Sequence, residues 1–126
     1  MEMRSHLARV RGLGSSNDGV GHWWAQRVTG IALVPLTIWF IFSAIGLAGA
    51  DLAEFKTWVG THANPVLLTL LIFTMFHHGQ LGLQVVIEDY VSCEKAKLTL
   101  LIATKFTAII FGGYSIFAVM RLTFGD

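Results

Sequence analysis

The stretch "VTGIALVPLTIWFIFSAIGLAGA", Val28–Ala50, contains no charged residue. As an α-helix it would be about 35 Å long, which exceeds the roughly 30 Å of a bilayer's hydrocarbon core. Two further apolar runs of similar length follow at residues 64–87 and 98–122. The sequence therefore predicts an all-α membrane protein with three transmembrane helices.

Composition supports the same class. Of the 126 residues, 54% are apolar and 13% charged, whereas a soluble domain carries roughly 25% charged residues. The net charge of +1 comes from scattered basic residues, so we expect membrane lipid around the chain and no nucleic-acid partner. One cysteine, Cys93, excludes an internal disulfide and a cysteine-based metal centre within this chain.

The remaining segments divide the chain into an N-terminal segment, 1–27, and a three-helix anchor domain, 28–126. "GSSND" (Gly14–Asp18) reads as a loop, and "SCEKAK" (Ser92–Lys97) reads as the link between the second and third spans. Between the first two spans, Asp51 is placed to cap a short interfacial helix.

The basic residues predict the direction of insertion, because cytoplasmic segments are enriched in Lys and Arg. Four of them precede the first span, and two lie in the loop between the second and third spans. These are Arg4, Arg9, Arg11 and Arg27, and then Lys95 and Lys97. We therefore expect a cytoplasmic N-terminus and a periplasmic C-terminus. Residues 1–26 match neither a secretory signal nor an arginine-rich presequence, which favours a multi-pass protein of a bacterial inner membrane.

Polar side chains interrupt the second span in "FHHGQLGLQVVIEDYV", Phe76–Val91. His78 falls near mid-membrane, with Gly82 about 40° from it around the helix and Asp89 about 20°. A glycine one turn from a histidine leaves room for a broad, flat group such as a haem bound through Nε2. Helix packing and proton transfer account for the same residues, so spacing alone leaves three interpretations open.

The other polar residues have two interpretations each. His77 is a competing ligand, but it points about 100° from His78 and has Leu81, not Gly82, one turn on. Tyr90 and Arg27 are typical of membrane interfaces in any protein. We expect Tyr90 and Arg27 at the same depth in the membrane, because Tyr90 ends the second span on the side where Arg27 begins the first.

The pattern as a whole resembles a known family. "HHGQLGLQVVIEDYV" resembles the second span of the smaller hydrophobic anchor subunit of succinate dehydrogenase, respiratory complex II. That family has a histidine, a glycine four residues later and Asp-Tyr eleven and twelve residues later, here His78, Gly82, Asp89 and Tyr90. Residues 21–36, "GHWWAQRVTGIALVPL", resemble the start of its first span.

The resemblance implies a site. His78 would be an axial ligand of a haem b shared with a second anchor subunit, and Gly82 would pack beside it. Tyr90 would donate a hydrogen bond to ubiquinone, with Asp89 shaping the pocket. Arg27 would lie near the haem propionates and the quinone. His77 and His22 remain secondary candidates, His22 facing either the quinone pocket or lipid headgroups.

The resemblance also implies partners: a second three-helix anchor subunit, an iron–sulfur subunit and a flavoprotein subunit. Electrons would pass from succinate through flavin and iron–sulfur centres to ubiquinone. The chain would have no activity by itself and no catalytic residue. Two alternatives stay open: a fumarate reductase anchor, and a non-redox small transporter or scaffold in which His77 and His78 relay protons or pack helices.

Overall fold

The computed structural model describes residues 16–125. This range contains four helices: α2 (Ser16–Gly46), α3 (Leu52–Val59), α4 (Asn64–Tyr90) and α5 (Glu94–Phe124). Three of them, α2, α4 and α5, are long and apolar enough to cross a membrane. The predicted all-α fold with three spans is confirmed. The arginines at positions 4, 9 and 11 lie outside the described residues.

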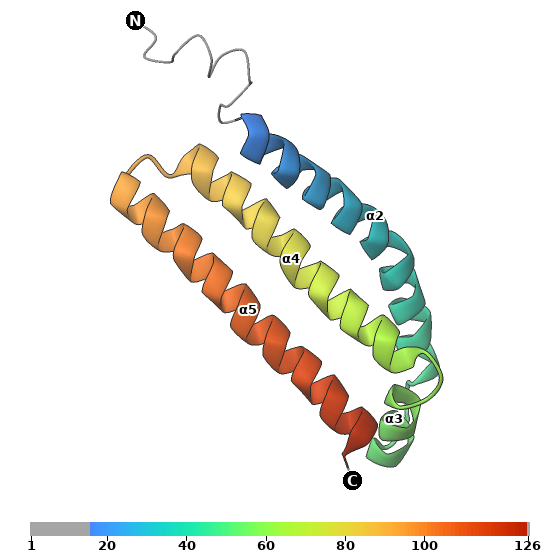
Figure 1. Cartoon of the computed structure of the whole chain (residues 1–126). Helices are drawn as coiled ribbons and strands as arrows, with labels where there is room; N and C mark the ends of the chain where they lie inside the picture. The colour runs from blue at the N-terminus through green and yellow to red at the C-terminus, as the bar shows by residue number, and fades with distance from the viewer. Residues whose placement is uncertain (1–15, 126) are drawn as a thin grey trace, which may run out of the picture.

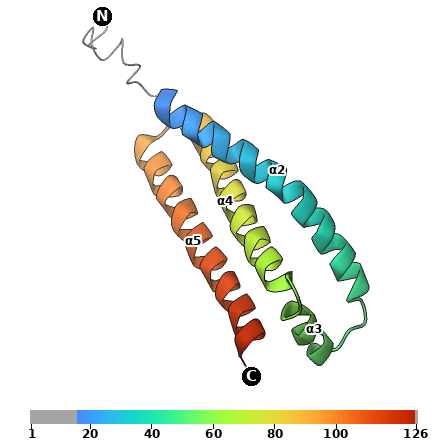
Figure 2. The ribbon, with the colours of Figure 1, turned by 45° about the vertical axis from the view of Figure 1, so that its right-hand side comes forward.

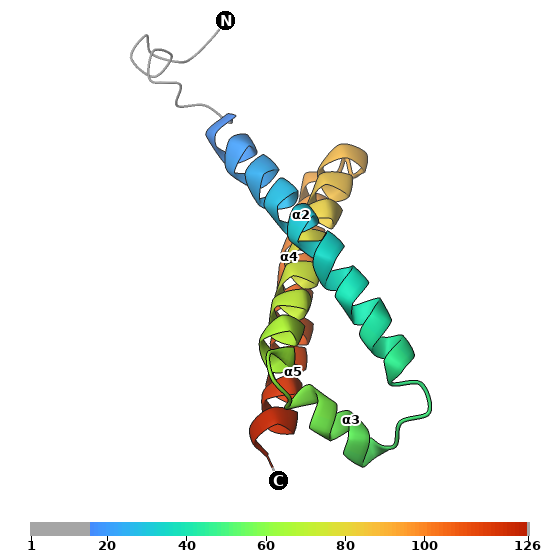
Figure 3. The same cartoon turned by 90° about the vertical axis from the view of Figure 1, so that its right-hand side faces the viewer.

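The three long helices form one layer with α4 in the middle (Figure 1). α4 contacts both α2 and α5, whereas α2 and α5 do not contact each other within the described chain. Figure 3 shows α2 crossing α4 obliquely, and Figure 2 shows the two helices diverging toward the end where α3 lies. The start of α2 and the α4–α5 turn share one end of the layer, and the C-terminus lies at the other.

The first span differs from its expected bounds. α2 begins at Ser16, so the loop expected at residues 14–18 is helical from Ser16 onward, and α2 ends at Gly46 rather than Ala50. The sequence did not predict the first turns of α2, because the residues there are polar. Some of them, such as His22, face α4 instead of solvent. The apolar run overshoots the end because residues 47–50 form turns, with Gly49 at φ 83°. Pro35 lies inside the continuous helix.

The second and third spans are longer than the apolar runs. α4 starts at Asn64 as expected, with Pro65 in its first turn, and continues to Tyr90. α5 begins at Glu94, so the link between them shrinks to residues 91–93. The acidic end of the second run is therefore part of the helix, which places Asp89 and Tyr90 on its last turn.

The short helix predicted between the first two spans, with Asp51 as its N-cap, is confirmed. Asp51 Oδ1 accepts a hydrogen bond from the Glu54 backbone N–H at 2.8 Å, and Glu54 Oε2 accepts one from the Asp51 N–H at 2.9 Å. This capping box satisfies two helix-end donors. α3 then buries Val59, 1% exposed, against α4 and α5. Trp58 stacks on Trp39 of α2 at 5.8 Å between ring centroids, which closes the end of the layer where α2 has diverged.

Elsewhere few side chains are buried between the described helices, and many large apolar side chains are exposed. At the α4–α5 contact, Gly112 is buried against Phe76, and a Cβ built at Gly112 would lie 3.4 Å from Phe76 Cγ. The next residue, Gly113, has no atom within 4 Å of such a Cβ. Gly112 therefore sets how closely α5 approaches α4.

Gly112→Leu should separate α4 from α5. The added carbons overlap the Phe76 ring, and overpacking of this kind costs about 1–3 kcal/mol. The measurement is thermal unfolding of the purified chain in detergent micelles, followed by tryptophan fluorescence. Gly113→Leu is the matched control and should unfold close to the wild type. Equal unfolding temperatures for the two variants would contradict the described contact.

Candidate functional site

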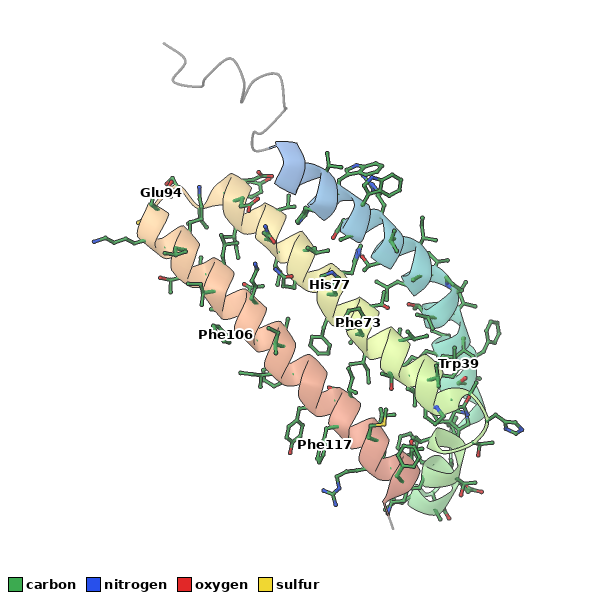
Figure 4. All side chains as sticks on the ribbon, viewed as in Figure 1. Trp39, Phe73, His77, Glu94, Phe106 and Phe117 are labelled. Carbon is green, nitrogen blue, oxygen red and sulfur yellow. The ribbon has the colours of Figure 1, made fainter. Side chains whose placement is uncertain are left out.

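The two adjacent histidines of α4 face different neighbours. His78 points toward α2, where it hydrogen-bonds to Thr29. His77 stacks on Phe73 of its own helix, with 5.7 Å between ring centroids, and lines a groove between α4 and α5. Figure 4 shows Phe73 and His77 on successive turns in the middle of α4. The expected angular separation of the pair therefore assigns each histidine to a different helix contact.

His78 is held by two consecutive residues of α2. Its Nδ1 lies 3.0 Å from Thr29 Oγ1, and Thr29 is 8% exposed. A Cβ built at Gly30 would lie 3.4 Å from His78 Cε1, so the ring edge rests against bare backbone. No hydrogen bond to Nε2 is found among the described residues. One ring nitrogen is thus held by α2, and the other makes no hydrogen bond within residues 16–125.

The contact between α2 and α4 continues toward the start of α2. His22 Nε2 lies 3.2 Å from the Leu81 carbonyl oxygen, to which it donates. Between His22 and Thr29, Gln26 Oε1 is buried without a hydrogen-bond partner among the described residues. Gln26 Nε2 would lie 3.8 Å from a Cβ at Gly82. The Gln26 amide therefore lies beside Gly82, in the direction in which a side chain at position 82 would point.

Sequence reasoning missed three residues of this contact: Thr29, Gly30 and Gln26. A usable signal was present, because positions 22, 26 and 29 recur at helical spacing. It pointed to one polar stripe along α2. What the sequence did not provide was the register between α2 and α4 that sets this stripe against His78.

A second polar row runs along the other side of α4. Gln80 Nε2 donates to Gln84 Oε1 at 3.4 Å, and Gln84 Nε2 donates to Glu88 Oε1 at 3.1 Å. The row leads from the helix end to the groove that His77 lines. This groove has a volume of about 400 Å³ and also contains Lys105 of α5. Gln80, Gln84 and Glu88 were not predicted from the sequence to form a hydrogen-bonded row.

Arg27 lies on the side of α2 that carries Gly30. Its guanidinium carbon is 5.5 Å from the Trp23 ring centroid, a distance at which cations interact with aromatic faces. Trp23, Arg27 and Gly30 are spaced four and three residues apart, so they share one face of the helix. Arg27 therefore stands one turn from the glycine that touches His78.

Arg27 is not brought to Tyr90, contrary to expectation. Since His22 lies opposite Leu81, Arg27 is closer in level to His78, while Tyr90 lies about 13 Å beyond Leu81 at the helical rise. No hydrogen bond or ion pair joins Arg27 to Asp89 or Tyr90 in the described range. Tyr90 is 83% exposed at the end of α4, and Asp89 beside it is also exposed.

The chemistry available to the described residues is that of a single ligand rather than a metal cluster. Residues 16–125 contain no group of three or more His, Cys, Asp or Glu placed to hold a metal ion. One imidazole nitrogen with its partner nitrogen fixed is suited to bind a metal that other groups also hold. Fold and site together define a multi-pass helical membrane protein that presents one histidine from the middle of its central helix.

Comparison with known proteins identifies the family. The succinate dehydrogenase/fumarate reductase transmembrane subunit family matches residues 1–113. The chain belongs to this family, which confirms the relationship expected from the sequence.

Individual relatives agree. The chain is 33% identical over 109 residues to the succinate dehydrogenase hydrophobic membrane anchor subunit of Rickettsia bellii, covering 86% of this chain and 87% of that protein. It is 35% identical over 96 residues to the subunit of the same name from Rickettsia felis, covering 76% and 80%. The subunit of that name from Paracoccus denitrificans is 24% identical over 116 residues, covering 92% and 89%. No solved structure matches the chain.

Cross-linking can test whether His78 faces α2 while His77 faces the groove between α4 and α5. In a Cys93→Ser background, Thr29→Cys with His78→Cys should be joined by a short bifunctional thiol reagent, because these side chains touch. Thr29→Cys with His77→Cys is the control and should not be joined. A protease site inserted between α2 and α3 lets a gel report whether the fragments stay together. Equal cross-linking of both pairs would contradict the described facing.

Proposed function

We propose that this chain is the small membrane anchor of a succinate:ubiquinone oxidoreductase. In this role it supplies one axial ligand to a haem b shared with a second anchor subunit, and it contributes to the quinone site. The observation that supports this most is the open Nε2 of His78 in a chain of this family. The relatives compared above are all named as succinate dehydrogenase subunits, which favours succinate oxidation over a fumarate reductase role.

His78 fits a haem better than His77 does. The Cε1–Nδ1 edge of its ring lies against Gly30, where a larger side chain would displace the imidazole, and its Nδ1 is already engaged by Thr29. His77 stacks on Phe73 instead. When bound, the haem would supply a one-electron centre whose potential depends on its axial ligands and their hydrogen bonds. His78 would hold and orient it from this subunit.

Arg27 is the residue we propose for the haem propionates. It shares a helix face with Gly30 and stands one turn nearer the start of α2. A guanidinium binds carboxylates through paired hydrogen bonds and stays charged at any physiological pH. The Trp23 ring under Arg27 would support it in that position.

We place the quinone site at the end of α4, where Tyr90 would donate a hydrogen bond to a carbonyl oxygen of ubiquinone. A donor aimed at this oxygen stabilises the negative charge that develops on reduction. Tyr90 lies about 18 Å along the helix from His78, so a haem and a quinone can both contact α4. Tyr90 is open to solvent or partners in the isolated chain, and other subunits would complete the pocket with Asp89.

The proposed partners are the second anchor, an iron–sulfur subunit and a flavoprotein subunit, the last two on the cytoplasmic face of a bacterial inner membrane. Lys95 and Lys97 lie in the first turn of α5, at the end of the layer that also holds the start of α2. By the positive-inside rule this end faces the cytoplasm, and the C-terminus faces the periplasm.

The first test of the proposal is a reduced-minus-oxidised visible spectrum of the complex purified through a tag on this chain. The wild type should bring down a flavoprotein and show sharp low-spin b-type bands. These bands should persist in His77→Ala and be lost or shifted in His78→Ala, because only His78 has its Nδ1 held by α2 while its Nε2 makes no hydrogen bond among the described residues. Bands that survive His78→Ala but not His77→Ala would reverse the ligand assignment. A preparation without haem or flavoprotein would favour a transporter or scaffold.

Tyr90→Phe tests the quinone site separately. It removes one hydroxyl and leaves the ring, so succinate-to-ubiquinone activity should fall by about 10- to 100-fold, because a hydrogen bond to a charged group contributes about 1.5–3 kcal/mol. Succinate oxidation with an artificial dye that accepts electrons before the quinone should be unchanged, and so should the haem bands. Unchanged ubiquinone reduction would exclude Tyr90 from the site.

A further inference from the structure

The Thr29 hydroxyl lies between the backbone of α2 and the His78 ring. Its Oγ1 is 2.6 Å from the Ala25 carbonyl oxygen, 3.1 Å from that of Gln26 and 3.0 Å from His78 Nδ1. A hydroxyl has one proton, and a carbonyl oxygen can only accept. The proton therefore goes to the backbone carbonyls, and Oγ1 accepts from the Nδ1–H of His78.

This assignment fixes the tautomer of the imidazole. With the proton on Nδ1, the neutral ring carries its free electron pair on Nε2, the nitrogen that a metal would bind. The hydroxyl cannot turn away freely, because its own bond to Ala25 holds it and because Thr29 is 8% exposed. Gly30 lies against the adjoining Cε1 atom of the ring, 3.4 Å from a Cβ built at that glycine. Two adjacent residues of α2 thus set both the tautomer and the direction of the His78 ring.

We infer that Thr29 is a positioning residue for the haem ligand, an inference that rests on the function proposed above. The hydrogen bond made by a ligating histidine's second nitrogen tunes the basicity of the ligand. The Thr29 hydroxyl donates its one proton to the backbone carbonyls, so it can only accept from the imidazole, and it does so as an uncharged group. It orients the imidazole without giving it the anionic character that a carboxylate would, so it tunes the reduction potential of the iron only moderately.

The test uses the intact complex with Thr29→Val and Thr29→Ser. Valine keeps the shape and loses the acceptor, whereas serine keeps the hydroxyl. The matched control is Thr69→Val, since Thr69 makes the same type of bond to the Pro65 carbonyl, at 2.8 Å, and none to a histidine. The readouts are the haem-to-flavin ratio, the haem midpoint potential and the ferric g values in electron paramagnetic resonance.

Thr29→Val should raise the midpoint potential and change the g values, because a less basic imidazole stabilises ferric iron less. Thr29→Ser and Thr69→Val should match the wild type. A Thr29→Val complex with full haem content and wild-type potential and g values would overturn the role of Thr29 alone. A wild-type complex without haem would instead overturn the proposed function, so the two failures are distinguishable.

If Thr29→Val does not assemble, the tautomer still decides. Nitrogen-15 NMR of the wild-type complex prepared without haem, with histidine labelled in this chain, should show the proton of the neutral His78 ring on Nδ1 and none on Nε2. The opposite tautomer would overturn the inference whatever the variants do.

Discussion

The contact of Thr29 with His78 joins α2 to α4 in a part of the chain where lipid offers no hydrogen bonds. Buried polar groups in such a setting must be satisfied within the protein. Here the Thr29 hydroxyl donates to the backbone of its own helix and accepts a hydrogen bond from the His78 ring. The Nδ1 of His78 therefore needs no other partner. α2 crosses α4 obliquely (Figure 3), and Thr29 Oγ1 of α2 lies 3.0 Å from His78 Nδ1 of α4.

The same constraint gives α4 two distinct polar sides. Toward α2, His78 and the carbonyl of Leu81 are met by Thr29 and His22. Away from α2, Gln80, Gln84 and Glu88 satisfy one another along the helix, while His77 rests on an aromatic ring. A central helix with two such sides can bind a cofactor through one of them and still pack within the membrane through the other.

Much of the fold was readable from the sequence, because three long apolar runs have few alternatives to spanning a bilayer. The end of α4 and the start of α2 were not, since Glu88 and His22 are polar residues inside helices. The pattern of His78, Gly82, Asp89 and Tyr90 indicated the family correctly. Thr29 and Gly30 could not be placed against His78, because the register of two crossing helices depends on tertiary packing. For the same reason Arg27 was expected near Tyr90, whereas it lies closer to the level of His78.

We propose that this chain binds a haem through Nε2 of His78, while Nδ1 of the same ring is held by Thr29. A cryo-electron microscopy map of the intact complex, purified through a tag on this chain, tests it most directly. The expected result is haem density joined to Nε2 of His78, with Nδ1 facing Thr29. Haem density on His77 in the α4–α5 groove, or no haem against this chain, would contradict it.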